Sequence, residues 1–126
     1  MARRISGPVA ALLIAAAVLV VAAGAGARAT KEIELTDVGG PQFIPDSKTI
    51  HRGDKVRWVW GAGAIEEHDV FLRRAPAGVR KGRFREPAHL GSGFTETSPA
   101  FKVKGDYRFV CTFHSGSMKA KVTVKR

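Results

Sequence analysis

The chain has 126 residues, of which 44% are hydrophobic and 25% are charged. Its 21 lysines and arginines exceed its 11 aspartates and glutamates, which gives a formal net charge of +10 at pH 7. This balance favours acidic partners or anionic surfaces. The basic residues are scattered along the chain, however, which argues against nucleic-acid binding. The single cysteine excludes an internal disulfide framework.

The first 29 residues have the pattern of a secretory signal peptide. Arg3 and Arg4 precede an apolar run over residues 9–23, and small residues follow up to Ala29. We predict cleavage after Ala29, with residues 1–29 as the leader. The protein would then be exported across the cytoplasmic membrane to the periplasm, the cell surface or the medium. Removal of the leader lowers the net charge from +10 to about +7.

An uncleaved membrane anchor is the alternative interpretation of the same segment. Residues 9–27 carry no charge and are close to the length that spans a bilayer. Contact with a membrane is expected only in that case. Under either interpretation, residues 30–126 form one domain, because this length supports a single hydrophobic core.

Alternation of polar and apolar residues predicts an all-β domain. Residues 73–97 are less periodic and are expected to form a loop with a short helical turn. Seven or eight short strands separated by glycine and aspartate turns indicate a Greek-key β-sandwich. The extended segments are expected at residues 31–36, 43–50, 55–60, 68–72, 100–103, 107–111 and 119–125.

The segment that follows the predicted strand 107–111 carries three metal-binding side chains. Cys111, His114 and Met118 offer a thiolate, an imidazole and a thioether, which are the donors that suit copper in both of its oxidation states. A trigonal blue-copper centre needs a second histidine, and His68 is the best candidate because it begins another predicted strand. Loops at one end of a sandwich cluster in space, so His68 can reach the Cys111 segment.

Other polar residues fit this chemistry less well. Glu66 and Glu67 are hard ligands and are interpreted as a local acidic patch. His51 and His89 belong to no spacing motif and are expected at the surface. We expect no enzymatic activity, because catalysis on oxygen or nitrite would need additional histidine-rich copper sites.

Several motifs extend the pattern along the whole predicted domain. They are Phe43-x-Pro45, Gly53-Asp54-x-Val56-x-Trp58, His68-Asp69-Val70, Gly105-x-Tyr107-x-Phe109-x-Cys111-x-x-His114-x-x-x-Met118 and Val122-Thr123-Val124.

With these motifs, the chain resembles the cupredoxins, the blue type 1 copper proteins of the plastocyanin, amicyanin and pseudoazurin kind. The resemblance covers roughly residues 32–124. It implies one type 1 copper ion, Cu(I) or Cu(II), with His68, Cys111 and His114 as strong ligands. Met118 would be the weak axial ligand.

Three positions depart from the family pattern. The loop between His114 and Met118 is intermediate in length between amicyanin-like and plastocyanin-like loops. Phe113 replaces a proline that is common in short loops, so it keeps a backbone N–H that could reach the Cys111 sulfur. Asp69 replaces a frequent asparagine. Its carboxylate could accept a hydrogen bond from Thr112, or it could face solvent beside a basic residue.

The function implied by these features is the transport of single electrons between redox proteins. The partners are expected to present acidic docking surfaces, and the chain is expected to be a monomer. The alternative is a copper protein that stores or delivers the ion without carrying electrons.

Overall fold

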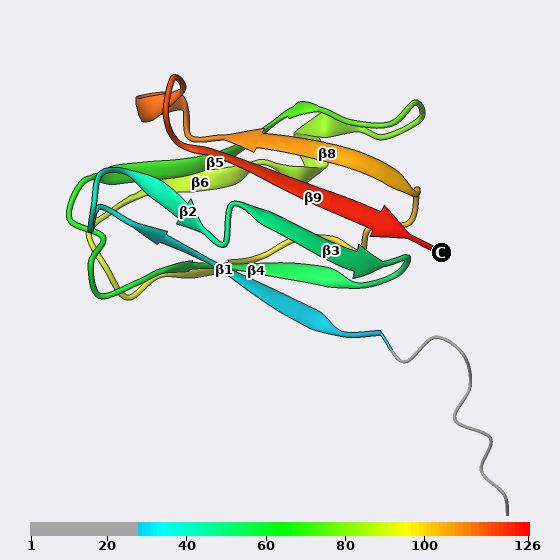
Figure 1. Cartoon of the computed structure of the whole chain (residues 1–126), viewed down its shortest axis with the longest axis horizontal. Helices are drawn as coiled ribbons and strands as arrows, with labels where there is room; N and C mark the ends of the chain where they lie inside the picture. The colour runs from blue at the N-terminus through cyan, green and yellow to red at the C-terminus, as the bar shows by residue number, and fades with distance from the viewer. Residues whose placement is uncertain (1–27) are drawn as a thin grey trace, which may run out of the picture.

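The computed structural model describes residues 28–126, so the predicted leader lies almost wholly outside the described residues. Two β-sheets pack against each other (Figure 1). One sheet has the strand order β2-β1-β4-β7 and the other has the order β3-β9-β8-β5-β6. The predicted all-β sandwich is therefore confirmed, with nine strands in the described part of the chain. Their bounds are β1 (Thr30–Thr36), β2 (Gln42–Ile44), β3 (Ser47–His51), β4 (Lys55–Trp60), β5 (Glu67–Arg74), β6 (Glu86–Leu90), β7 (Thr95–Thr97), β8 (Gly105–Val110) and β9 (Lys119–Lys125).

Both sheets contain strand pairs that are distant in sequence. Strand β1 pairs in parallel with β4, and β3 pairs in parallel with β9. The remaining pairs are antiparallel, including β5 with β8 and β8 with β9. Two short 3₁₀ helices complete the described elements, η1 (Lys81–Phe84) and η2 (Thr112–His114). Among residues 28–126, no helix is long and apolar enough to cross a membrane.

Alternating strands supply the core between the sheets. Val56, Trp58 and Trp60 all lie on the inner face of β4 and are at most 1% exposed. The Trp58 ring packs edge-on against Phe43 of its own sheet, with centroids 5.6 Å apart, and against Phe109 of the facing sheet at 4.9 Å. Because such aromatic pairs bury large apolar areas, the Trp58 ring stabilises the packing of the two sheets against each other.

Three segments differ from the sequence-based expectation. The stretch 43–50 is not one strand, because β2 and β3 belong to different sheets. The irregular stretch 73–97 contains η1 but also β6 and β7, which lie at sheet edges and lack the alternation of buried and exposed residues. The expected strand at 100–103 is wrong. Its buried Phe101 is held instead by backbone hydrogen bonds with Gly53 and Asp54.

The two ends of the sandwich differ in charge. The Cys111 end consists of loops 37–41, 61–66, 91–94 and 111–118, at the left of Figure 1. These loops contain Asp37 and Glu66 but no lysine or arginine.

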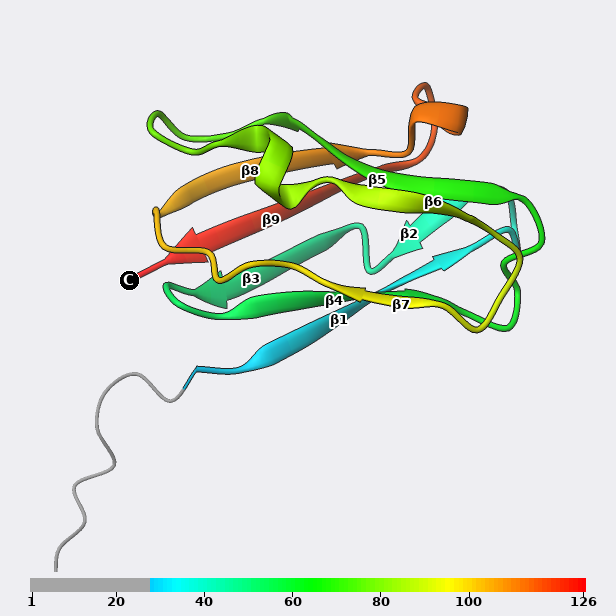
Figure 2. The ribbon, with the colours of Figure 1, turned by 180° about the vertical axis from the view of Figure 1, so that it is seen from behind.

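The opposite end, where the chain enters the sandwich, consists of residues 28–29, 52–54, 75–85, 98–104 and 126. Figure 2 shows this entry end at the left, beside the start of β1. Asp54 is its only acidic residue, and it is 2% exposed. The basic residues of the entry end are Arg28, Arg52, Arg80, Lys81, Arg83, Arg85, Lys102, Lys104 and Arg126.

A buried carboxyl group lies on edge strand β6. Glu86 is 7% exposed, and its burial, together with repulsion from Glu96, raises the pKa of this carboxyl from 4.5 to about 7. A neutral carboxyl is the form that tolerates burial without a cation beside it. Glu86 is therefore protonated in the folded protein under mildly acidic conditions.

This raised pKa predicts a loss of stability with increasing pH. Between about pH 4.5 and 7 the unfolded chain releases the Glu86 proton while the folded chain retains it, so the free energy of unfolding falls as pH rises through this window. Glu86→Gln should remove this decline and be more stable than the wild type by about 1–3 kcal/mol at pH 8. Urea unfolding at pH 5 and pH 8 measures the difference. Equal pH dependence of the two proteins would contradict the assignment.

Candidate metal centre

Three of the predicted ligands meet at the Cys111 end. One ligand atom each from His68, Cys111 and His114 lies within 4.8 Å of the others. The Nδ1 atom of His68 is 3.8 Å from the Cys111 sulfur, and Nδ1 of His114 is 3.7 Å from it. His68 and Cys111 are fully buried, whereas the His114 side chain is 23% exposed.

Strand pairing and a tight turn produce this arrangement. His68 is the second residue of β5, next to an irregularity in its pairing with β6. Cys111 follows β8, the other neighbour of β5. The N–H of His114 donates to the carbonyl of Cys111 at 3.2 Å, and the N–H of Cys111 donates to the carbonyl of Met118 at 3.0 Å. These bonds close the turn that begins with η2, so the positions of Cys111 and His114 are set by the backbone.

Asp69 joins the two halves of the site. Its Oδ1 accepts a hydrogen bond from the backbone N–H of Thr112 at 2.7 Å, and its Oδ2 accepts one from the Thr112 hydroxyl at 2.6 Å. Asp69 is 4% exposed. Of the two interpretations left open by the sequence, the hydrogen bond with Thr112 is confirmed and the solvent-facing carboxylate is wrong.

Burial and neighbouring backbone N–H groups have opposite effects on the pKa of the Cys111 thiol. Burial is the largest effect and raises the pKa of the thiol above its usual value. Backbone N–H groups of Asp69 and Phe113 act in the other direction by stabilising the thiolate. The backbone N–H that Phe113 retains, where a proline would have none, lowers the pKa of the Cys111 thiol.

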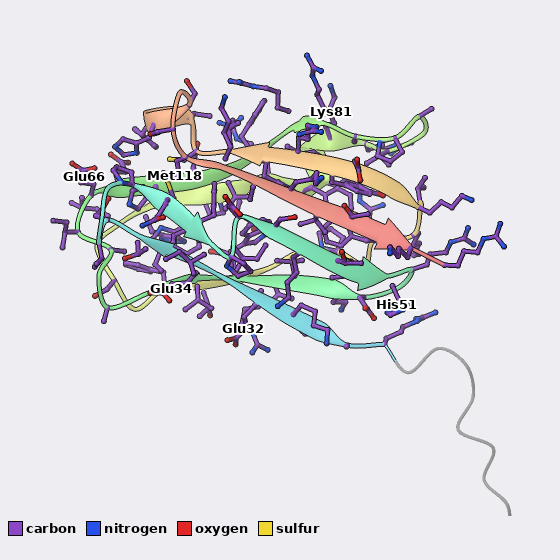
Figure 3. The ribbon with its side chains drawn as sticks, in the orientation of Figure 1. Glu32, Glu34, His51, Glu66, Lys81 and Met118 are labelled. Atoms are coloured by element: carbon purple, nitrogen blue, oxygen red, sulfur yellow. The ribbon has the colours of Figure 1, made fainter. Side chains whose placement is uncertain are left out.

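Met118 is fully buried at the same end of the molecule. Its backbone N–H donates to the His114 carbonyl at 2.9 Å, which ties it to the ligand turn. Figure 3 shows Met118 at the end of the sandwich that also carries Glu66. The structure thus places Met118 in the turn that carries Cys111 and His114 and buries its thioether, a weak ligand type for copper.

Carboxylates meet the outer nitrogens of both histidines, and sequence reasoning missed both contacts. Nε2 of His68 lies 2.9 Å from Oδ1 of Asp37, although the ring N–H is not aligned for a directed hydrogen bond. Nε2 of His114 lies 2.9 Å from Oε2 of Glu66. Glu66 is therefore part of the site, not merely of a local acidic patch.

Asp37 also holds the loop that carries Glu66. Its Oδ2 accepts hydrogen bonds from the backbone N–H groups of Ile65 at 2.7 Å and Glu66 at 2.9 Å. Burial alone would raise the pKa of Asp37, but these bonds outweigh burial and the pKa lies below its usual value. Asp37 is thus an anion. Its Oδ1 lies beside the His68 ring, and its Oδ2 binds the backbone of the neighbouring loop.

The other two histidines lie apart from this cluster. His51 is exposed at the end of β3, as expected. His89 also reaches the surface, with its side chain 22% exposed, and its ring stacks on Phe94 with ring centroids 4.3 Å apart. Nε2 of His89 also lies within hydrogen-bond distance of Glu96, at 2.9 Å.

Comparison with known proteins agrees with the fold and the donor set. Residues 30–125 match the sequence model of the copper-binding proteins of the plastocyanin/azurin family. Plastocyanin A/B of Petroselinum crispum is 33% identical over 95 residues, covering 74% of this chain and 98% of that protein.

Solved structures share the same architecture. Oxidised plastocyanin from Dryopteris crassirhizoma is 27% identical, with a TM-score of 0.58 over 75% of this chain and 99% of that one. Pseudoazurin from Methylobacterium extorquens is 23% identical, with a TM-score of 0.59 over 77% of each chain, which is a likeness of fold. The chain therefore belongs to the plastocyanin/azurin family of copper-binding proteins.

The residues present fit the copper ion that this family binds. Type 1 copper takes a thiolate and two imidazoles, and the chain brings the buried Cys111 and His68 together with the partly exposed His114. The inner Nδ1 atoms of both rings face the sulfur, while the outer Nε2 atoms face carboxylates. Outer contacts of this kind orient a ligating ring and raise its basicity.

The Asp69 contact predicts a specific effect on stability. Asp69→Ala removes the acceptor of both Thr112 hydrogen bonds and should lower the free energy of unfolding of the metal-free protein by about 1–3 kcal/mol. Urea denaturation measures the loss. Asp69→Asn is the matched control, because its amide can accept from the Thr112 N–H and donate to the hydroxyl oxygen. Equal destabilisation by both substitutions would contradict this role.

Proposed function

We propose that the chain carries single electrons between redox partners through one type 1 copper ion. His68, Cys111 and His114 are the strong ligands in this proposal, and Met118 is the weak axial ligand. The observation that carries it is the meeting of three ligand atoms within 4.8 Å, supplied by β5 and by the turn after β8. Copper supplies one-electron chemistry as it alternates between Cu(II) and Cu(I).

The chain's own contribution is a fixed geometry. Asp69 ties the His68 strand to the turn, the Asp37 carboxylate faces the outer nitrogen of His68, and backbone N–H groups act on the sulfur. A site held in this way changes little when its charge changes, so electron transfer requires little rearrangement. No enzymatic activity of its own is proposed for the chain.

His114 provides the route between the site and the surface. Its ring is partly exposed, whereas His68, Cys111 and Met118 are fully buried. Electrons would therefore enter and leave through His114. Five large apolar side chains on or beside the loops of this end are 40–72% exposed and form an apolar rim for docking. They are Val38, Ile65, Leu90, Phe94 and Phe113.

A basic groove beside the site would select acidic partners. It runs along β5, β8 and β9 and includes Val110, the residue before Cys111. Its volume is about 380 Å³, and Asp46 is its only acidic lining residue. Docking on the apolar rim would bring an acidic partner against this groove. Its basic lining residues are Arg73, Arg74, Arg108, Lys119 and Lys121.

The proposed location is outside the cytoplasmic membrane. The support is the signal-peptide pattern of residues 1–29, which leaves residues 30–126 as the exported domain. The first strand begins at Thr30, directly after the predicted cleavage site. In the exported form the chain would act as a monomer, and it would remain attached to the membrane only if the leader is retained as an anchor.

Visible absorption with Cu(II) tests the proposed site directly. We expect an intense thiolate-to-copper charge-transfer band that Cys111→Ser abolishes, because the band requires the sulfur ligand. Met118→Leu should retain the band and shift the reduction potential, since the axial ligand is weak. Loss of copper binding in Met118→Leu would contradict the axial assignment, and a band unaffected by Cys111→Ser would contradict the site.

Voltammetry of the same sample separates an electron carrier from a protein for copper storage or delivery. A carrier should cycle reversibly between Cu(II) and Cu(I) without losing the ion. Release of copper on reduction, captured by a Cu(I) chelator, would support storage or delivery instead.

The Asp37 carboxylate should lower the reduction potential. Its negative charge beside the outer nitrogen of His68 favours the more positive Cu(II) state. Asp37→Asn should therefore raise the potential by about 60 mV, which corresponds to a tenfold change for a one-electron couple. Asp46→Asn removes an equal charge outside the ligand cluster and is the control. A potential that rises equally in both variants would leave no special role for Asp37.

The basic groove should accelerate reaction with anionic oxidants. Arg108→Glu combined with Lys121→Glu should slow oxidation of the Cu(I) protein by hexacyanoferrate(III) by at least about threefold at low ionic strength. Arg80→Glu combined with Arg83→Glu gives the same net charge at the entry end and should have a smaller effect. Stopped-flow rates over a series of salt concentrations measure both. If both double variants slow the reaction equally, the effect comes from the net charge of the protein and not from the groove.

A further inference from the structure

The entry end contains a second basic groove, remote from the metal centre. It has a volume of about 590 Å³ and lies between the start of β1 and β4, the η1 segment and the loop before β8. No acidic side chain lines it. Its basic lining residues are Arg28, Lys55, Arg80, Arg83 and Lys102.

The one acidic residue of the entry end is Asp54, and it offers these cations no charge partner. Asp54 is buried, with one oxygen accepting from the Ala29 N–H at 2.8 Å and the other from the His51 N–H at 2.9 Å. Burial alone would raise the pKa of Asp54, but these backbone bonds outweigh it and keep the carboxyl ionised. Because the Asp54 carboxylate is buried in these hydrogen bonds, it does not reach the surface. The exposed charges of the entry end are therefore cationic.

The groove also combines charge with apolar surface. Phe84 and Tyr107 line it as buried rings, and Val103 beside them is 37% exposed. Long basic side chains above apolar groups suit the boundary between lipid headgroups and acyl chains, where charged tips can reach phosphate while their stems remain in apolar surroundings.

We propose that the entry end binds the surface of a membrane that contains anionic phospholipids. The chain itself supports this occupant, because the uncharged apolar run of residues 9–27 joins the sandwich at Arg28, on the rim of the groove. A retained leader would hold this end against the bilayer. Cleavage after Ala29 removes Arg28 and the Ala29 N–H, but Asp54 keeps its hydrogen bond from the His51 N–H. Lys55, Arg80, Arg83 and Lys102 still provide four cations in the groove.

This contact would orient the metal centre. The Cys111 end lies at the opposite end of both sheets and has no lysine or arginine in its loops (Figure 1). A membrane bound at the entry end therefore leaves His114 and the apolar rim facing away from the lipid and free for partners. The inference does not depend on the metal, so it can be tested on metal-free protein.

Vesicle sedimentation tests the proposal with residues 30–126, the form expected after cleavage, which contains all nine strands and the core between them. We expect binding to phosphatidylglycerol vesicles at low salt, no binding to phosphatidylcholine vesicles, and release at high salt. Arg80→Gln, Arg83→Gln and Lys102→Gln combined should weaken binding by at least about 30-fold. The control combines Arg73→Gln, Arg74→Gln and Lys121→Gln, which removes the same charge from the other groove. Equal weakening by both triple variants, or no binding to anionic vesicles, would overturn the proposal.

Fluorescence distinguishes the orientation and the type of partner. Val103→Trp should shift to shorter wavelength on phosphatidylglycerol vesicles, whereas Phe113→Trp at the opposite end should not. The reverse pattern would overturn the orientation. Tight binding of polyglutamate with no binding to anionic vesicles would show that the groove takes an acidic polypeptide and would overturn the lipid assignment.

Discussion

Asp69 accepts two hydrogen bonds from Thr112, and through them the strand that carries His68 is joined to the turn that carries Cys111 and His114. The two segments are distant in sequence, and this bridge links them directly in addition to the pairing of β5 with β8. A carboxylate is well suited to the task because it has two acceptor oxygens, one for the N–H and one for the hydroxyl. The site is therefore held by contacts within the protein that do not involve the metal.

Much of the architecture could be predicted from the sequence, because the chemistry is local and periodic. Cys111, His114 and Met118 share one turn, so their spacing alone indicates the donor set. The alternation of Val56, Trp58 and Trp60 identifies the inner face of β4. Such patterns arise because successive side chains of a strand point to opposite faces. They can therefore be recognised in the sequence without knowledge of the tertiary packing.

The features that were missed depend on tertiary context. Asp37 and Glu66 approach the histidines only because separate loops meet at one end of the sandwich, and no spacing in the sequence records that meeting. Strands β6 and β7 are short edge strands, and β6 contains Pro87, so neither has an alternating pattern. Phe101 is buried because it is apolar, yet its backbone hydrogen-bonds with Gly53 and Asp54 outside any strand. Apolar character predicts burial more reliably than it predicts strand.

If the chain is exported as proposed, the position of β9 has a consequence for how its thiol becomes buried. This last strand lies between β3 and β8 in its sheet, and its pairing with β3 is parallel and joins residues far apart in sequence. Non-local pairings of this kind make folding slow, on the scale of milliseconds to seconds. Until β9 docks, Cys111 is open to mixed disulfides in an oxidising compartment. Completion of the sheet would then shield the thiol from oxidants, because Cys111 is buried in the folded chain.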